Sequence, residues 1–526
     1  MTGTNGSDAT GTNGSAATGT NGSDATGTNG RDATGTNGSA ATGNRRPYVI
    51  GQLARDLGAV VGDDHVSTAQ PDLDAQSADW SWMSQFMRLR DLPLPTADVV
   101  VHPQSAEEVE GIVRIASEYR APVVPRGGGS GTQGGTFALY GGIAVDLTRM
   151  DRILEIDETS LTVTVQAGID GSVLEKELAG LGLTLPHYPG SHFFGATIGG
   201  SLAARGSGVV STKYGKAEDL ALQVEAVVPP GKLVRTLPVP NHAAGPDLLQ
   251  TLIGSEGTLG IITEATMRLE PLPEDRRFLS YQFPSVDAGL EAARLIMTGR
   301  IVPAAMRLYD EADSAKLTSM LDLDTAGVLL IIVLDGRPRA MDLEEEGIAD
   351  VAARCEGTDL GGGPAQTWWD GKYEPFAKHN APAPPTVFGT TDTCARFSAL
   401  PGLYRAKKHV IEEGFAEYGA RYTAHFSHWY PWGGMIYDRF YVDDAPEDPD
   451  RALALHDRLW DAAITTSLAH GGIINEHHGV GLKLGRFMRP QYGAAFDLLL
   501  AVKDAWDPDG IMNPGKLGFG APRSGW

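Results

Sequence analysis

Six of the eleven residues in Pro125-Arg-Gly-Gly-Gly-Ser-Gly-Thr-Gln-Gly-Gly135 are glycine, and the segment follows the short apolar run Ala121–Pro125. Because glycine lacks a Cβ, backbone N–H groups can converge there on an anion at close range, and Arg126 can add a charged contact. The pattern Gly-x-Gly-x-x-Gly also typifies a dinucleotide-binding Rossmann unit, which opens a helix directly after it. Here Thr136–Gly142 contains two more glycines and leads into a strand pattern. We therefore predict a phosphate or pyrophosphate loop outside a Rossmann unit, with an ordinary surface turn as the alternative.

Two more glycine-rich loops follow along the chain. Pro189-Gly-Ser-His-Phe-Phe-Gly-Ala-Thr-Ile-Gly-Gly200 ends in small residues that favour close approach of the backbone. Gly254-Ser-Glu-Gly-Thr-Leu-Gly-Ile-Ile262 is a tight turn that enters an apolar strand. Three such loops indicate an extended ligand with several polar sections, which fits a dinucleotide better than a mononucleotide.

The composition argues against several classes of protein. The 526 residues include 43 Lys and Arg against 66 Asp and Glu, a net charge of −23, so nucleic acid or an anionic membrane would be repelled. Only two cysteines occur, which argues against a disulfide framework and a cysteine-based zinc site. The longest uncharged apolar run, Ala326–Leu334, is too short to span a bilayer, and no secretory signal is visible. We therefore expect a soluble, cytoplasmic protein without a transmembrane segment.

The chain divides into four parts by composition and pattern. Residues 1–44 form a tail in which five copies of an eight-residue unit, TGTNGSDA with small variations, fill residues 2–41. These small polar residues cannot bury enough apolar surface to fold, so we predict a disordered tail. Residues 45–273 mix helices and strands with short connections, which indicates an α+β domain. Residues 274–472 form a second domain, and residues 473–526 carry polar residues and end in a Pro/Gly loop.

Individual elements follow from capping boxes and hydrophobic periodicity. In the first domain, Ser105-Ala-Glu-Glu108 and Ser172-Val-Leu-Glu175 predict two helix starts, and Ile143–Leu147 and Leu161–Ala167 alternate as strands. In the second domain we expect a hairpin around Tyr430–Gly434. The elements expected there are helices near Ala288–Thr298, Leu400–Tyr418 and Asp450–His470, and strands near Pro303–Leu308, Val328–Leu334, Arg421–Trp429 and Met435–Val442.

The strand Met435–Val442 is the first candidate for chemistry. Alternation places Tyr437, Arg439 and Tyr441 on one face, while Asp438 interrupts the apolar opposite face. A buried phenol can donate or accept a proton, and a buried guanidinium can hold a carboxylate or phosphate. A solvated polar strand face is the alternative interpretation.

Asn475-Glu-His-His-Gly-Val-Gly481 is the second candidate. Two adjacent histidines on an extended segment point to opposite sides, so at most one of them faces a given ligand. Glu476 and His478 would share a side, where the carboxylate can orient the imidazole as a general base. The two glycines let the backbone pass close to a flat ring. We predict no metal site, because contiguous residues converge poorly and no distant ligand is evident; histidines with a structural role are the alternative.

The three loops, in this order, resemble those of the vanillyl-alcohol-oxidase/p-cresol-methylhydroxylase-type flavoproteins, and Asp507–Lys516 is similar to the closing motif of that superfamily. Within it, the chain resembles the alkyldihydroxyacetonephosphate synthases, and its His-Gly-Val-Gly motif also resembles that of FAD-dependent D-2-hydroxyacid dehydrogenases. The stretches that carry the resemblance are Tyr214–Leu220, Gly245–Asp247, Gly254–Ala265, Met306–Leu308 and His477–Gly481.

The resemblance runs from about Gly51 to Leu517 and implies a fold and a cofactor. Residues 45–273 would form a two-subdomain PCMH-type FAD-binding domain, and residues 274–472 a substrate domain with an antiparallel sheet flanked by helices. Residues 473–526 would return to the flavin. Relatives that bind FAD covalently use a His in the first loop or a Cys in the second; the matching positions here are Gly129 and Ser130, and the second loop has no Cys, so we expect non-covalent FAD.

The implied FAD contacts lie in the three loops, with Asn513 or Lys516 near the isoalloxazine. The full set is Pro125, Arg126, Gly127, Gly128, Gly129, Ser130, Gly131, Thr132, Pro189, Gly190, Ser191, Ala196, Thr197, Gly199, Gly200, Tyr214, Glu256, Gly257, Thr258, Gly260, Ile261, Ile262, Asn513 and Lys516.

The resemblance also implies catalytic roles. Tyr437 stands at the position of a catalytic tyrosine on a strand that faces the flavin, and Arg307 matches an arginine near the flavin or substrate. The predicted catalytic set is Tyr437, His478, His477, Arg439, Glu476 and Arg307. The chain departs from the synthase pattern of three successive histidines, because Glu476 replaces the first, and Gly389–Arg396 matches its counterpart only loosely.

We therefore predict an FAD-dependent oxidoreductase that transfers hydride from a hydroxyl-bearing carbon of a hydroxy acid, alcohol or phenolic substrate to flavin N5. Its partners would be the small-molecule substrate and an electron acceptor, and the family analogy suggests a homodimer. A non-redox flavin transferase like the alkyldihydroxyacetonephosphate synthases is the first alternative. A catalytically inactive flavin-binding protein is the second.

Overall fold

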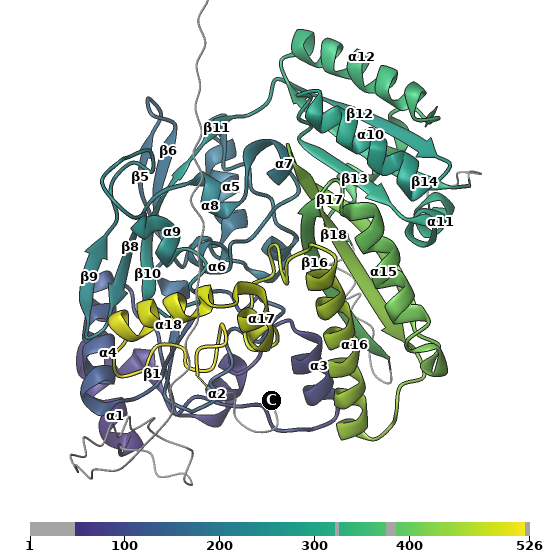
Figure 1. Cartoon of the computed structure of the whole chain (residues 1–526). Coiled ribbons are helices and arrows are strands. Elements are labelled where there is room, and N and C mark those ends of the chain that lie inside the picture. Colours follow the sequence, from purple (N-terminus) through teal and green to yellow (C-terminus); the bar gives the residue numbers. More distant parts are fainter. Residues whose placement is uncertain (1–47, 321–325, 375–385, 521–526) are drawn as a thin grey trace, which may run out of the picture. The chain divides into compact units, whose positions relative to one another are not determined.

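The N-terminal lobe, described over residues 48–273, contains two main sheets and one short two-stranded sheet (Figure 1). The computed structural model describes residues 48–320, 326–374 and 386–520, so the predicted repeat tail lies outside the described residues. The first sheet has the order β1-β2-β4-β3, with β2, β4 and β3 parallel and packed against helices α1 and α4. The bounds are α1 Ile50–Val61, β1 Val66–Ser67, β2 Val99–Val101, α4 Ala106–Tyr119, β3 Val123–Arg126 and β4 Ile143–Asp146.

The first predicted helix start is confirmed. Ser105 caps α4 by accepting a hydrogen bond from the N–H of Glu108 at 3.3 Å. The first glycine loop leaves β3 and reaches β4 with no α-helix between them, as predicted. A Rossmann unit is therefore absent from this segment.

The second sheet of the N-terminal lobe is antiparallel, in the order β5-β6-β10-β8-β9. Helices α5 and α6 cover it with Leu174, Leu178, Ile198 and Leu202. The bounds are β5 Ile153–Asp157, β6 Thr162–Gln166, α5 Gly171–Ala179, α6 Ile198–Ala203, β8 Ala221–Val228, β9 Lys232–Arg235 and β10 Ile261–Arg268.

The second predicted helix start is wrong, because the N-cap is Asp170, two positions before the predicted Ser172. Asp170 caps α5, because its carboxylate accepts from the N–H of Ser172 at 2.7 Å. Glu175 does not return to the cap; it accepts from the Thr184 hydroxyl at 2.6 Å and from the N–H of Leu185 at 3.0 Å. Glu175 therefore binds Thr184 and Leu185 and does not form the predicted capping box.

Short elements connect these sheets. They are α2 Gln70–Gln76, α3 Trp82–Leu89, β7 Leu183–Thr184, α7 Ser211–Tyr214, α8 Ala217–Leu220, α9 Leu248–Leu252 and β11 Glu270–Pro271, with β7 pairing β11.

The C-terminal lobe, residues 274–472, is built on one antiparallel sheet in the order β15-β12-β14-β13-β17-β18-β16. Helices α10, α12, α15 and α16 cover its outer face (Figure 1). The bounds are β12 Asp275–Phe283, α10 Val286–Thr298, β13 Ala305–Tyr309, α11 Glu311–Met320, β14 Val328–Gly336, α12 Pro338–Arg354, β15 Thr358–Asp359, α13 Gly363–Asp370, β16 Val387–Arg396, α15 Leu400–Glu412, β17 Arg421–Tyr430, β18 Gly433–Val442 and α16 Pro449–Ala469.

The predicted hairpin is confirmed as β17 and β18, and Asp438 has a reason to interrupt its apolar face. The Lys407 Nζ atom on α15 lies 2.5 Å from the Asp438 carboxylate, and both side chains are fully buried. Tyr422 donates to the same carboxylate at 3.0 Å. The polar residue therefore marks a buried ion pair, which the sequence pattern did not reveal.

The C-terminal segment returns to the N-terminal lobe, where Figure 1 shows its yellow helix α18 (Ala495–Trp506). The short helix α17 (Met488–Tyr492) precedes α18, and its Met488 joins the core of the C-terminal lobe. Met512 pairs with Val123 as an extra parallel bridge beside β3. The sheets change from one lobe to the other near residue 274, in keeping with the predicted division, and the exact domain boundaries stay a prediction.

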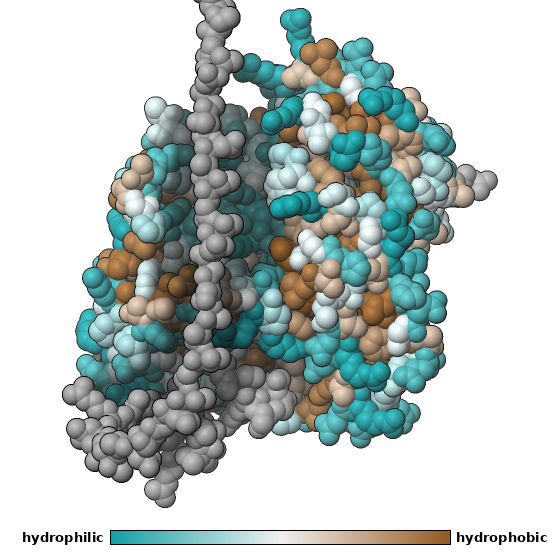
Figure 2. All heavy atoms as spheres, in the orientation of Figure 1, coloured by the Kyte–Doolittle hydropathy of each residue, from teal (hydrophilic) through white to brown (hydrophobic). Residues whose placement is uncertain are grey.

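Within the described residues, no helix combines the length and the apolar character needed to cross a bilayer. On the face shown in Figure 2, hydrophilic side chains are spread over the outer helices, with hydrophobic residues scattered between them.

Candidate functional site

The candidate site lies on the inner face of β16, β17 and β18. In their antiparallel pairing, Tyr437 is directly opposite both Asp392 and His425, so the three side chains share a face. The His425 ring stacks on Tyr437 with centroids 4.8 Å apart and an interplanar angle of 16°. Tyr437 also lies 5.3 Å from the His478 ring and 5.9 Å from the His477 ring. The structure therefore joins the two sequence candidates into one cluster.

Asp392 holds this cluster together, and the sequence analysis missed it. Its carboxylate accepts the backbone N–H groups of Glu476, His477 and His478 at 2.9, 2.6 and 3.2 Å. It also contacts Nδ1 of His478 at 2.8 Å. Burial opposes ionisation, but the two neighbouring imidazoles hold the pKa of Asp392 well below its usual range. With Nδ1–H directed at this carboxylate, Nε2 of His478 carries the lone pair that can accept a proton.

The prediction that Glu476 orients His478 is wrong. Glu476 instead contacts Nδ1 of His477 at 2.8 Å and Nδ1 of His428 at 3.1 Å, and Lys216 lies 3.5 Å away. The segment is not extended: its backbone bends around the Asp392 carboxylate, so simple alternation fails. Burial opposes the charge on His477, but Asp392 and Glu476 raise its pKa to about 9. His477 is therefore an imidazolium at neutral pH.

Two arginines flank the cluster. Arg439 pairs with Asp313, and Arg307 lies 3.4 Å from Nε2 of His425, with its guanidinium 5.1 Å from the centroid of the Trp368 ring. Burial and the charges of Arg307 and Arg439 hold the pKa of His425 well below its ordinary value, so this ring is neutral. Among the described residues, Nε of Arg439 and Nδ1 of His425 are buried without a hydrogen-bond partner. Such unpaired donors are expected where an anionic ligand completes the site.

Two groups of side chains also have the proximity needed for a cation. The ligand atoms of Asp392, His477 and His478 lie within 4.8 Å of one another, as do those of His428, Glu476 and His477. The expectation that no distant ligand joins this segment is therefore wrong, because the strands bring Asp392 and His428 to it. The absence of a metal from the protein stays a prediction.

The first glycine loop forms an anion cradle. The backbone N–H groups of residues 128–132 donate no hydrogen bond within the described part of the chain. A Cβ at Gly131 would meet no atom of the described residues within 4 Å, whereas a Cβ at Gly128 would lie 1.7 Å from the carbonyl oxygen of Gly195 in the second loop. The loop thus has unpaired amides next to open space at Gly131, while at Gly128 it packs closely against Gly195. These residues fit the pyrophosphate of FAD.

The third loop and the C-terminal segment fasten this cradle. The Glu256 carboxylate accepts the N–H groups of Val480 and Gly481 at 2.5 and 2.7 Å, and burial raises its pKa to about 7. Asn513 donates to the Glu256 carbonyl at 2.7 Å. Lys516 donates to the Phe137 carbonyl at 2.7 Å, and burial lowers its pKa to about 7. Within the protein these side chains connect loops, and a contact of Asn513 or Lys516 with the isoalloxazine stays a prediction.

Two predicted cofactor residues also bind protein groups. The Arg126 guanidinium donates to the Ala78 carbonyl at 2.7 Å and packs behind Gly129. The Tyr214 hydroxyl donates to Asp335 at 2.9 Å, where it joins the two lobes. A contact of either residue with FAD stays a prediction.

The glycines after His478 serve close packing of loops. Gly479 and Gly481 have φ values of 81° and 50°. A Cβ at Gly479 would lie 3.0 Å from the Glu256 carboxylate, and one at Gly481 would lie 2.2 Å from the Gln133 carbonyl. The expected approach to a flat ring stays a prediction; the approach to the first and third loops is what the structure contains.

Comparison with known proteins identifies the family. Residues 97–237 match the family model described as an FAD binding domain, and residues 272–517 match the C-terminal domain of FAD linked oxidases. The FAD-linked oxidoreductase YgcU of Escherichia coli is 31% identical over 484 residues, which cover 88% of this chain and 97% of that protein. The chain belongs to the FAD-linked oxidase family.

Other relatives carry different names. Alkyldihydroxyacetonephosphate synthase of Trypanosoma brucei brucei is 30% identical over 455 residues, covering 80% of this chain and 73% of that protein. The mitochondrial D-lactate dehydrogenase (cytochrome) of Arabidopsis thaliana is 30% identical over 429 residues, with the same two coverages.

Solved structures agree on the fold. A crystal structure of alkyldihydroxyacetonephosphate synthase superposes with a TM-score of 0.75 at 26% identity, covering 90% of this chain and 87% of that one. p-Cresol methylhydroxylase superposes with a TM-score of 0.71 at 18% identity, covering 89% and 97%, and supports the fold alone. The chain is a flavoprotein with the PCMH-type fold, and FAD is its cofactor, as the sequence resemblance implied. Non-covalent attachment stays a prediction.

Proposed function

We propose that this chain oxidises the hydroxyl-bearing carbon of a small substrate, with hydroxy acids favoured over simple alcohols and phenols. One observation carries the proposal: the Asp392–His478 contact faces the same cluster as Tyr437, Arg307 and Arg439. When bound, FAD supplies the hydride acceptor at N5. The protein then has to bind the substrate, orient it and remove the hydroxyl proton.

His478 is the proposed proton acceptor. The buried, ionised Asp392 fixes Nδ1–H of His478 at 2.8 Å, which leaves Nε2 to take the proton from the substrate hydroxyl. Tyr437, held flat against His425, would position the substrate oxygen by a hydrogen bond.

The charges around the cluster favour an anionic substrate. Arg439 keeps a buried Nε without a partner among the described residues, and Arg307 presents its guanidinium beside the neutral His425. The imidazolium of His477 adds a third positive charge nearby. A carboxylate accepts hydrogen bonds from planar guanidinium groups in a bidentate arrangement, which would hold a 2-hydroxy acid in one orientation.

A non-redox transferase remains the second candidate because named synthases are 30% identical to this chain. The synthase pattern has three successive histidines, whereas this chain has Glu476 in place of the first. Glu476 contacts His477 and His428. A positively charged third histidine at that position would meet Lys216 at close range. The altered charge supports the oxidative proposal.

Anaerobic mixing tests the two functions. The purified holoenzyme is mixed without oxygen with D- and L-2-hydroxy acids, secondary alcohols and phenolic benzylic alcohols, and the yellow flavin absorbance is followed. We expect lasting loss of colour with one enantiomer of a 2-hydroxy acid. If the colour persists with the whole panel, the oxidative proposal is wrong. If the flavin is bleached, dioxygen and a quinone are added separately to the reduced enzyme, and the one that restores the colour is the electron acceptor.

A further inference from the structure

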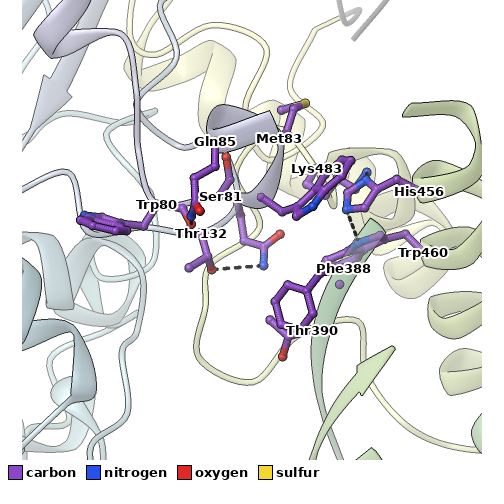
Figure 3. Close-up of a pocket in the computed structure, with 13 residues that line it drawn as sticks. Trp80, Ser81, Met83, Gln85, Thr132, Phe388, Thr390, His456, Trp460 and Lys483 are labelled. Atoms are coloured by element: carbon purple, nitrogen blue, oxygen red, sulfur yellow. Dashed lines mark hydrogen bonds between the residues drawn. The ribbon is translucent and has the colours of Figure 1, made fainter. Parts of the chain in front are cut away.

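A cavity of about 70 Å³ lies beside this site, between the first glycine loop and the seven-stranded sheet (Figure 3). Its aromatic lining residues are Trp80 from the loop before α3, Trp82 at the start of α3, Phe388 from β16 and Trp460 from α16. Lys483 is part of the lining. A lysine beside so much aromatic surface is unusual, because a charged ammonium loses its hydration there.

The cavity adjoins the proposed catalytic face. Thr390, which lines it, pairs across the strands with Arg439, just as Asp392 pairs with Tyr437. Residues two apart on β16 share a face, so Thr390 and Asp392 lie side by side on the same surface. A small molecule in the cavity is therefore next to the substrate site.

The hydrogen bonds of His456 favour the uncharged form of Lys483. The indole Nε1–H of Trp460 donates to Nε2 of His456 at 3.0 Å (Figure 3). Because an indole can only donate, Nε2 must hold the lone pair, and the neutral imidazole carries its proton on Nδ1. Nδ1 in turn lies 2.9 Å from Nζ of Lys483. This contact is a hydrogen bond only if Nζ accepts, and an amine accepts only when it is uncharged.

The surrounding charges are compatible with an uncharged amine. On α16, Asp457 contacts Nζ and Asp461 is nearby, while Arg486 opposes them from the segment Gly485–Phe487. The Asp457 carboxylate is 56% exposed, so solvent screens its pull on the proton, and it can accept from an amine N–H as well as from an ammonium. Burial dominates and lowers the pKa of Lys483 to about 8.

We propose that Lys483 is an amine nucleophile that captures small carbonyl compounds as imines in this cavity. The hydrogen bond from His456 to Nζ opens first, which frees the lone pair. The Nζ lone pair then attacks the carbonyl carbon, the carbonyl π electrons move to oxygen, and one proton passes from nitrogen to that oxygen. The resulting hydroxyl leaves as water with the remaining N–H proton, and C=N forms with no net oxidation or reduction. The inference does not depend on the proposed function, although an aldehyde or ketone is also what an alcohol oxidation releases.

The size of the cavity limits the carbonyl compound. About 70 Å³ is roughly half of the ~150 Å³ in which a benzene ring fits inside an engineered protein. A chain of two or three carbons beyond the carbonyl therefore matches the space, and a fused aromatic ring does not. Propanal is the matched probe, and 1-naphthaldehyde is the oversized control.

Reductive trapping tests the proposal. The holoenzyme is incubated with propanal and cyanoborohydride from pH 6 to pH 10, and N-propylation is located by peptide mass spectrometry. With its pKa near 8, Lys483 would hold about 100-fold more neutral amine at pH 8 than an ordinary lysine, so it should be labelled first. Lys232, exposed on β9, is the reference. 1-Naphthaldehyde should label Lys232 but not Lys483.

Two variants test the hydrogen-bond argument. Trp460→Phe removes the indole donor, so His456 can carry its proton on Nε2 and accept at Nδ1 from an ammonium. The pH of half-maximal labelling at Lys483 should then rise. Trp82→Phe is the matched control: Trp82 stacks on the other side of His456, at 4.2 Å, without a hydrogen bond to it, and its profile should stay as in wild type.

Each outcome is decisive. Preferential labelling of Lys483 by propanal at pH 8, with an upward shift in Trp460→Phe alone, supports the proposal. Labelling of Lys483 no faster than Lys232, or equal labelling by both aldehydes, overturns it. The wild-type profile decides by itself if a variant does not fold, and a failure here leaves the anaerobic bleaching result untouched.

Discussion

Asp392 is the residue that sets the chemistry of the candidate site, and no local pattern pointed to it. It lies more than eighty residues before the histidines it holds. The sequence did indicate Tyr437, His477, His478, Arg439, Glu476 and Arg307, and the structure places all six around one cluster. Their partners could not be predicted, because hydrogen bonds across the sheet depend on strand register, not on spacing along the chain.

Replacing Asp392 with Asn tests its positioning role. Asp392→Asn keeps the shape but removes the charge that orients His478, so we expect kcat/KM to fall about 10²- to 10⁴-fold with FAD still bound. Stopped-flow flavin reduction measures the effect. Asp443→Asn, at an exposed carboxylate just after β18, is the control. Equal losses in both variants would contradict the role.

His477 predicts how stability depends on pH. Its pKa is raised to about 9 in the folded protein, from about 6.5 in the unfolded chain. The stabilisation is therefore complete below pH 6.5 and is lost as pH rises through 9, up to about 3 kcal/mol. Urea unfolding at pH 6.5, 8 and 9.5 measures this loss. His477→Gln should flatten the dependence over that range, and an unchanged slope would show that another group causes it.

At the scale of elements, the hairpin β17–β18 followed from alternation, while β16 did not. The stretch Val387–Arg396 is rich in Thr and contains Asp and Gly, and its inner face is polar because it borders the site. Because the inner face of β16 is polar, the alternation of apolar and polar residues that indicates a strand is missing there. The reverse error occurred at α5, where a capping box was predicted and Asp170 is the actual cap.

The ion pair Lys407–Asp438 gives a prediction about the packing of α15 on this sheet. Lys407→Met leaves a fully buried carboxylate without its cation, so we expect a loss of about 3–5 kcal/mol in the free energy of unfolding. Arg421→Met breaks the exposed pair with Asp443 and should cost less than about 1 kcal/mol. Urea titration of both variants compares them. A double variant, Lys407→Met with Asp438→Leu, should recover much of the loss.

At the scale of the whole molecule, the order of the three glycine loops was enough to predict the fold and the cofactor. It could not predict how the loops are fastened, because Arg126, Glu256 and Lys516 bind protein groups far along the chain. The join between the lobes was equally hidden: Lys213 and Tyr214 both contact Asp335 on β14. Composition and motif specify the parts, whereas long-range polar contacts specify their assembly.

Two glycines of the first loop separate a structural role from cofactor binding. Gly128→Ala would place a methyl group 1.7 Å from the Gly195 carbonyl, so both folding stability and FAD retention should fall. The methyl group of Gly131→Ala meets no atom within 4 Å in the described part of the chain, so the apoprotein should keep its melting temperature while FAD affinity falls at least tenfold. Thermal unfolding of apoprotein and FAD titration measure the two effects. Unchanged FAD affinity in Gly131→Ala would remove this loop from the cofactor site.

The bridge between Val123 and Met512 has a consequence for biosynthesis. Residues 511–516 brace the loop that begins at Pro125, so a nascent chain still holding them inside the ribosome cannot finish its nucleotide cradle. The vitamin-derived cofactor can therefore bind only after nearly four hundred residues beyond this loop have emerged from the ribosome. Folding intermediates on the ribosome should consequently be colourless.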